Sequence, residues 1–115
     1  MSAEEAKKNY LGHSGPRRMN CAESIAHAFK NKIPLSDEEL KNYKNFGGGR
    51  APEGYCGAIY AAKCLLEKSG SEKAALLPEI FRNIAGSFKC REIRTLKKIS
   101  CLDCVEKAAQ AIEEK

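Results

Sequence analysis

Apolar residues recur along this chain at the spacing of an amphipathic helix, three or four positions apart. No stretch alternates between apolar and polar residues as a half-buried strand does, and valine occurs only once, at Val105. The chain therefore predicts an all-α fold, a compact helical bundle of about five to six helices in a single domain. Inward positions are expected at Ile25, Ala26, Ala28 and Phe29, and at Val105, Ala108, Ala109 and Ile112.

Helix starts and stops are marked by residues that cap helix ends. Asn20 can cap a first helix that ends near residue 32, and Ser36 with Glu39 forms a capping box for a helix to about residue 46. Ser100 with Asp103 resembles a capping box that opens a last helix. A helix starting at about residue 52 and another over 79–85 complete the set, with Pro78 predicted to separate the latter from a turn or short helix before it.

Length and composition fit one folded domain over residues 1–115, with residues 1–9 expected to be frayed. The 115 residues are 43% hydrophobic and 30% charged, too apolar for a disordered chain and too interrupted by charge for a membrane span. The first residues carry acids and no apolar core of a secretory signal, so we expect a cytoplasmic protein without a membrane partner.

Six cysteines are the main candidates for chemistry, because a reducing compartment disfavours a structural disulfide framework. Cys21, Cys56 and Cys101 fall at predicted helix starts, where free N–H groups and the helix dipole favour thiolate over thiol. Cys90 lacks such a cap, but its neighbours Lys89 and Arg91 favour the thiolate as well.

These four cysteines are separated by 35, 34 and 11 positions, which matches no compact zinc-finger or bacterial ferredoxin spacing. A common site therefore needs the tertiary fold to bring four segments together, and buried packing is the alternative for each thiol. Cys104 shares a helix face with Cys101 and is core, a spare ligand or a resolving thiol. Cys64 lies eight positions after Cys56, and we expect it in the core.

Glycines flank the second of these thiols. Gly47, Gly48 and Gly49 form neither a dinucleotide-binding motif nor a phosphate loop. Together with Gly57 they are predicted to let the backbone approach a cofactor closely and donate N–H groups to sulfur, although a plain helix stop explains the run equally.

The net charge of +5 is concentrated in one basic run near the carboxyl end, comprising Lys89, Arg91, Arg94, Lys97 and Lys98. The run lacks the aromatic residues and motifs of nucleic-acid binding, which we therefore do not expect. A solvated helix face is one interpretation. The other is that the cations offset a thiolate-bound cluster or attract an acidic redox partner protein.

Several of these motifs, in this order, resemble the redox-active protein family named C_GCAxxG_C_C. They are Asn20-Cys21-Ala22, Phe46-Gly47-Gly48-Gly49, Cys56-Gly57-Ala58, Phe88-Lys89-Cys90-Arg91-Glu92-Ile93, and Cys101 followed by Val105 and Ala108-Ala109. The resemblance spans about residues 10 to 113 and implies a redox role, typical of anaerobic prokaryotes, in modules associated with iron–sulfur centres.

Our leading hypothesis is a small iron–sulfur electron-transfer protein in which Cys21, Cys56, Cys90 and Cys101 hold a two-iron or four-iron cluster. A second hypothesis is a thiol–disulfide oxidoreductase or redox sensor that uses Cys101 with Cys104, or Cys56 with a partner thiol. A third is a structural module with zinc or with no cofactor.

Overall fold

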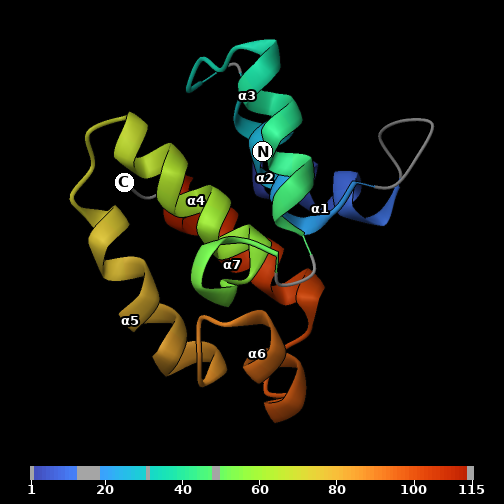
Figure 1. The fold of residues 1–115 in the computed structure, drawn as a ribbon, viewed down its shortest axis with the longest axis vertical. Coiled ribbons are helices and arrows are strands. Elements are labelled where there is room, and N and C mark those ends of the chain that lie inside the picture. The colour runs from blue at the N-terminus through green and yellow to red at the C-terminus, as the bar shows by residue number, and fades with distance from the viewer. Residues whose placement is uncertain (1, 13–18, 31, 48–49, 114–115) are drawn as a thin grey trace.

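The computed structural model, shown in Figure 1, describes residues 2–12, 19–30, 32–47 and 50–113. Within these ranges the chain forms seven α-helices, two short 3₁₀ helices and no strand, which confirms the all-α fold with slightly more helices than expected. The elements are α1 (Ser2–Leu11), α2 (Cys21–Phe29), α3 (Asp37–Asn42), η1 (Tyr43–Phe46), η2 (Pro52–Gly54), α4 (Gly57–Lys68), α5 (Lys73–Ala85), α6 (Cys90–Leu96) and α7 (Cys101–Glu113). Every helix in the described part is too short or too polar to cross a membrane.

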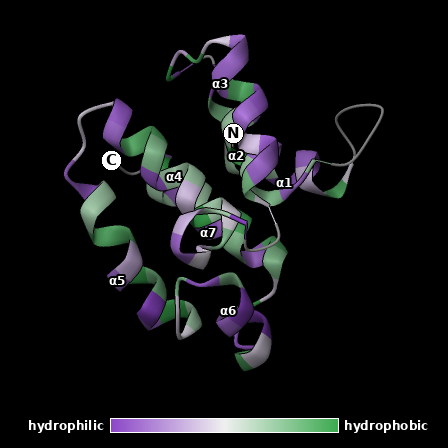
Figure 2. Cartoon of the chain, viewed as in Figure 1, coloured by the Kyte–Doolittle hydropathy of each residue, from purple (hydrophilic) through white to green (hydrophobic). Residues whose placement is uncertain are grey.

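The core lies between α2, α4 and α7, which pack against one another, with α1 covering α2 and α7 and with α5 on the other side of α4 (Figure 1). Many of its residues are alanine, so the helix backbones can approach closely, and Phe29, Phe81, Leu65 and Leu66 fill the remaining space. Figure 2 shows many hydrophobic residues along α4 and largely hydrophilic residues on α6. The inward positions expected on α2 and α7 are buried as predicted.

The predicted helix caps are confirmed. The Asn20 side chain accepts a hydrogen bond from the Glu23 N–H at 2.8 Å, and Glu23 in return accepts from the Asn20 N–H. Ser36 with Glu39 opens α3 in the same way, and Ser100 with Asp103 opens α7. Each cap satisfies amide groups that a helix start leaves unpaired, so each fixes the residue at which its helix begins.

The segment over residues 1–9 was expected to be frayed, but residues 2–9 belong to α1 (Ser2–Leu11), and residue 1 lies outside the described residues. Its apolar face is small, yet Ala6 is fully buried against the core. Polar contacts add to this packing: the Lys7 ammonium lies 3.2 Å from the Glu106 carboxylate of α7, and the Asn9 amide donates to the Ser24 carbonyl of α2. Tertiary contacts therefore order a segment whose own hydrophobicity is low.

Three other boundaries differ from the prediction. Pro78 does not break α5, because Leu77 and Phe81 bury one continuous face and a proline there removes only one backbone hydrogen bond. The helix expected from residue 52 is instead η2 followed by α4, with Cys56 as the cap of α4. Residues 90–96, for which no helix was predicted, form α6.

Candidate functional site

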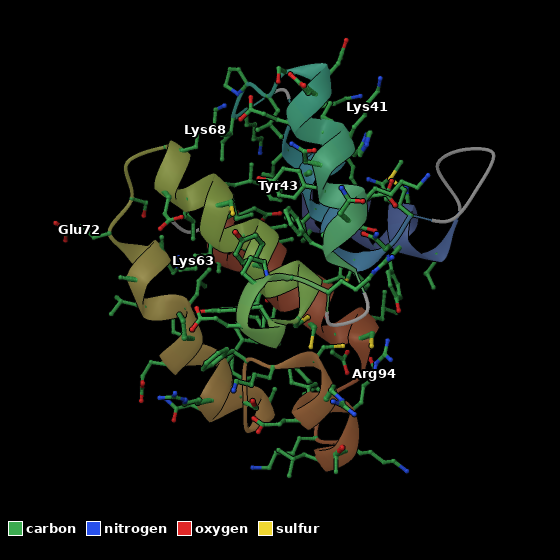
Figure 3. The ribbon with its side chains drawn as sticks, in the orientation of Figure 1. Lys41, Tyr43, Lys63, Lys68, Glu72 and Arg94 are labelled. Carbon is green, nitrogen blue, oxygen red and sulfur yellow. The ribbon has the colours of Figure 1, made fainter. Side chains whose placement is uncertain are left out.

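Four cysteines that are distant in the sequence line one cavity of about 360 Å³, together with Tyr10, Met19, Asn20 and Arg94. The four are Cys21, Cys56, Cys90 and Cys101, the residues singled out as candidate ligands. They come from the starts of α2, α4, α6 and α7. Figure 3 shows sulfur atoms gathered near the labelled Arg94. The fold therefore brings these four side chains together, although their role as ligands remains a prediction.

Two of the four thiols owe their position to a capping box. Cys21 is the first residue of α2, directly after the cap Asn20, and Cys101 is the first residue of α7, directly after Ser100. Both side chains are half-buried at the cavity. Because the cap fixes where the helix begins, it also fixes where the next side chain leaves the backbone.

The other two thiols are joined by a short backbone contact between two turns. The Cys56 N–H donates to the Phe88 carbonyl at 2.8 Å, and Tyr55 and Lys89 form an isolated antiparallel bridge. The rings of Tyr55 and Phe88 also lie in contact, with centroids 4.7 Å apart. This contact brings the start of α4 to the start of α6, where Cys90 follows Lys89, so all four candidate thiols lie at helix starts.

Gly57 makes room for the cavity sulfur of Cys21. A Cβ atom at position 57 would lie 2.6 Å from the Cys21 Sγ and 2.7 Å from the Phe46 carbonyl oxygen, closer than atoms can approach. Gly47 has a similar role beside Asn20, since a Cβ there would lie 2.8 Å from that side chain. Gly48 and Gly49 lie outside the described residues, and a cofactor contact by any of these four glycines remains a prediction.

The thiol pKa values run against the expectation that these sites favour thiolate. The hydrogen bond with Cys104 is the main cause that raises the pKa of Cys56 to about 12, and burial adds to it. Burial is also the main cause that raises the pKa of Cys90, with Arg94 opposing it. Desolvation and neighbouring sulfurs thus outweigh the helix dipole at these two positions, and the thiols are stable in the protonated form.

Arg94 is the cation of the cavity. It lies four residues after Cys90, on the same face of α6, and its guanidinium hydrogen-bonds with the sulfur of Cys101, which raises the pKa of Arg94. It also lines a neighbouring hollow of about 530 Å³ with Lys97, Lys98 and Cys101. The basic run therefore reaches the cavity, a role that the i, i+4 spacing from Cys90 could have indicated.

Cys104 lies in the core and does not line the cavity. Its side chain is 1% exposed, and Cys104 is the main cause of the raised pKa of Cys56. Among the alternatives left open by the sequence, core packing is the one that its burial shows.

Cys64 lies apart from the cavity. It packs against the core but is only half-buried, so the expectation of a core residue is met in part, and it hydrogen-bonds with Tyr60 and Tyr43. Burial is the main cause that raises the pKa of Cys64, and it raises the pKa of Tyr43 as well. Cys64 is therefore a matched internal control for the cavity thiols.

The donor set of the cavity suits an iron–sulfur cluster, which four cysteine thiolates hold in either its two-iron or its four-iron form. In the described part of the chain, no three His, Cys, Asp or Glu side chains form a group that could hold a metal ion as they stand. The four lining thiols match such a cluster in donor type and in number.

The fold and site define a small all-helical protein with a thiol-lined cavity. Residues 19–115 match the family model described as "Putative redox-active protein (C_GCAxxG_C_C)", so the chain belongs to that family. This match confirms the resemblance that the sequence motifs indicated, and the family is described as redox-active. Comparison with the curated proteins and with the solved structures gives no significant match.

Proposed function

We propose that this protein transfers electrons through an iron–sulfur cluster held by Cys21, Cys56, Cys90 and Cys101. The observation that supports this proposal most is that the starts of four helices each direct one of these thiols to the same cavity. When bound, such a cluster supplies a reversible electron-accepting centre.

The surroundings of the four thiols suit such a centre. Cys56 and Cys90 are each 6% exposed, which limits the access of water to the sulfurs. Arg94 places a positive charge beside Cys90 and Cys101 and so compensates negative sulfur. The caps at Asn20 and Ser100 hold the first residues of α2 and α7 in place, as supporting hydrogen bonds do around other metal ligands.

The partner in this proposal is an acidic electron-transfer protein that docks on the face of α6. Five basic residues on α6 and directly beside it are exposed, namely Lys89, Arg91, Arg94, Lys97 and Lys98. Two nearby acids are engaged locally, since the Glu92 carboxylate accepts a hydrogen bond from the Ser87 hydroxyl and the Asp103 carboxylate accepts one from the Ser100 N–H. Arg94 and Cys101 line both the cavity and the neighbouring hollow, so this face gives a docked partner the shortest approach to the thiols.

The test is iron and sulfide analysis with visible absorption spectra, on protein purified and reconstituted without oxygen. We expect each of the four Cys→Ser changes at the cavity to lower bound iron at least severalfold, whereas Cys64→Ser retains it. Far-UV circular dichroism checks that each variant is folded. A colourless wild-type protein without iron rejects the proposal, and equal losses at all the cysteines reject the assignment of ligands.

Two other outcomes distinguish the remaining hypotheses. Stoichiometric zinc with no redox change in solution would select a structural zinc module. A trapped mixed disulfide with a substrate thiol, together with loss of activity in Cys104→Ser, would select a thiol–disulfide oxidoreductase.

A further inference from the structure

A second hollow, of about 440 Å³, lies between η1 and α4 and shares no lining residue with the thiol cavity. Three aromatic side chains line it, with Tyr43 and Phe46 from η1 and Tyr60 from α4. The Phe46 ring contacts both of the others edge to face, with its centroid 5.9 Å from that of Tyr43 and 5.0 Å from that of Tyr60. Figure 3 shows the labelled Tyr43 on the side of η1 that faces α4. The hollow has the size of a small-molecule site, and its aromatic walls favour a flat ring.

The polar groups of this hollow favour an uncharged ligand. Lys68 and Glu39 line it as an ion pair, with the ammonium 2.7 Å from the carboxylate, so their charges cancel. A bound anion would compete with Glu39 for Lys68. The amide of Asn42 and the tyrosine hydroxyls can donate hydrogen bonds to carbonyl oxygens without such competition. The lining therefore suits a flat, neutral molecule that carries carbonyl oxygens.

A series of ring contacts leads from this hollow to the thiol cavity. The Tyr60 ring in the hollow lies 5.8 Å from the Tyr55 ring, and the Tyr55 ring lies 4.7 Å from the Phe88 ring, measured between centroids. Tyr55 directly precedes Cys56, whose N–H donates to the Phe88 carbonyl at 2.8 Å. A molecule bound against Tyr60 would therefore be connected, through side chains in direct contact, to a centre held by Cys56.

We propose that the hollow between η1 and α4 binds a quinone, which accepts electrons from the cluster of the proposed function. A quinone is flat, neutral and redox-active, and it carries two carbonyl oxygens. Two reduced clusters each lose one electron, and the quinone gains these two electrons with two protons from water, so that its two carbonyl groups become the hydroxyl groups of a hydroquinone. The electron transfer rests on the proposed function, whereas binding of the quinone requires no metal.

Binding is tested on reduced, iron-free protein with duroquinone, whose fully methylated ring does not undergo addition of thiols. A brief exposure to iodoacetamide, followed by trypsin and mass spectrometry, measures the reactivity of single thiols, because Cys64 falls in the peptide 64–68 and Cys21 in the peptide 19–30. Both thiols are half-buried, but Cys64 lines the hollow and Cys21 lines the thiol cavity. We expect saturating duroquinone to slow the alkylation of Cys64 at least fivefold and to leave that of Cys21 unchanged. Alkylation of Cys64 that duroquinone does not slow, or equal slowing at both cysteines, overturns the proposal.

The aromatic wall is tested by equilibrium dialysis of duroquinone against two variants at one position. Tyr60→Leu should weaken binding at least tenfold, whereas Tyr60→Phe, which keeps the ring, should bind as the wild type does. Circular dichroism checks that both are folded. Equal binding by Tyr60→Leu and Tyr60→Phe contradicts the assignment of the hollow. The protection of Cys64 is measured on the wild type, so it tests the proposal even if a variant fails to fold.

The electron transfer is tested by mixing iron-loaded, reduced protein with duroquinone in the absence of oxygen and following the visible absorption of the cluster. We expect oxidation of the cluster to be at least tenfold slower in Tyr60→Leu than in Tyr60→Phe. Equal rates in these two variants refute electron transfer to a quinone in this hollow. Wild-type protein that takes up no iron refutes the proposed function instead, and the protection of Cys64 then decides whether the quinone binds.

Discussion

Replacement of Gly57 by alanine should destabilise the protein, although alanine is ordinarily the better residue for a helix. Gly57 is the buried first residue of α4, and its backbone is in an ordinary conformation, so the reason for glycine is space alone. The added methyl would lie 2.6 Å from the Cys21 Sγ and 2.7 Å from the Phe46 carbonyl oxygen. The carbonyl oxygen belongs to the backbone and cannot move without shifting η1.

The magnitude follows from two opposing effects. Alanine gains at most about 1 kcal/mol over glycine inside a helix, and less at its first residue. Overpacking of a filled interior costs about 1–3 kcal/mol. The net loss of unfolding free energy should therefore be about 1–2 kcal/mol, which lowers the Tm of a chain of this size by roughly 4–8 °C.

The assay is unfolding of reduced, iron-free protein by heat or urea, followed by circular dichroism. A double-mutant cycle with Cys21→Ala isolates the sulfur contact: the cost of Gly57→Ala should fall by about 1 kcal/mol when the sulfur is absent. Gly54→Ala is the control, because position 54 has a φ of +76° and no atom within 4 Å of an added Cβ. Its cost comes from the backbone and should be equal in both backgrounds. A Gly57→Ala protein as stable as the wild type, or a cost that does not depend on Cys21, would refute this account.

Two further predictions concern charges outside the cavity. Changing Lys97 and Lys98 together to glutamate should slow reduction of the protein by an acidic ferredoxin at least tenfold at low salt. The same change at Lys41 and Lys44, which lie on and just after α3, should have little effect on that rate. Equal rates in the two double variants would contradict the docking face. The Lys68 ammonium, 2.7 Å from the Glu39 carboxylate, lowers the pKa of Glu39 to about 2. The wild type should therefore be more stable than Glu39→Gln above pH 4.5, and this difference in stability should vanish as the pH falls towards 2. Acid-unfolding curves of the two proteins measure it. This exposed pair is screened by solvent, so the difference should be small, and one that persists at pH 2 would mean that it does not arise from the ion pair.

Local chemistry was sufficient to predict the starts of α2, α3 and α7. A capping box needs only residues that lie three positions apart, and the boxes at Asn20, Ser36 and Ser100 all form. The stop at Gly86 is local too, because its φ of +85° is a conformation that glycine adopts without strain. Two of the four candidate thiols, Cys21 and Cys101, could be selected on this basis, since each directly follows such a cap.

The parts that were missed depend on contacts between distant segments. Helix α1 has one fully buried alanine and is held by contacts to α2 and α7, which its own sequence does not reveal. Helix α6 buries only Cys90 and Ile93, and its many cations conceal this short apolar face. The raised pKa values of Cys56 and Cys90 could not be predicted either, because burial and sulfur contacts exist only in the folded protein.

The assembly of the site depends chiefly on the contact between the turn before α4 and the turn before α6. Capping alone would leave Cys56 and Cys90 on separate segments, 34 positions apart in the chain. The hydrogen bond from the Cys56 N–H to the Phe88 carbonyl joins them, and the ring contact between Tyr55 and Phe88 shields that bond from water. A backbone bond of this kind survives changes in side-chain charge, so it holds the two thiols together whether or not they are protonated. The same bond fixes the position of Cys56 at the cavity, so a single contact between backbone atoms determines where two of the four candidate thiols lie.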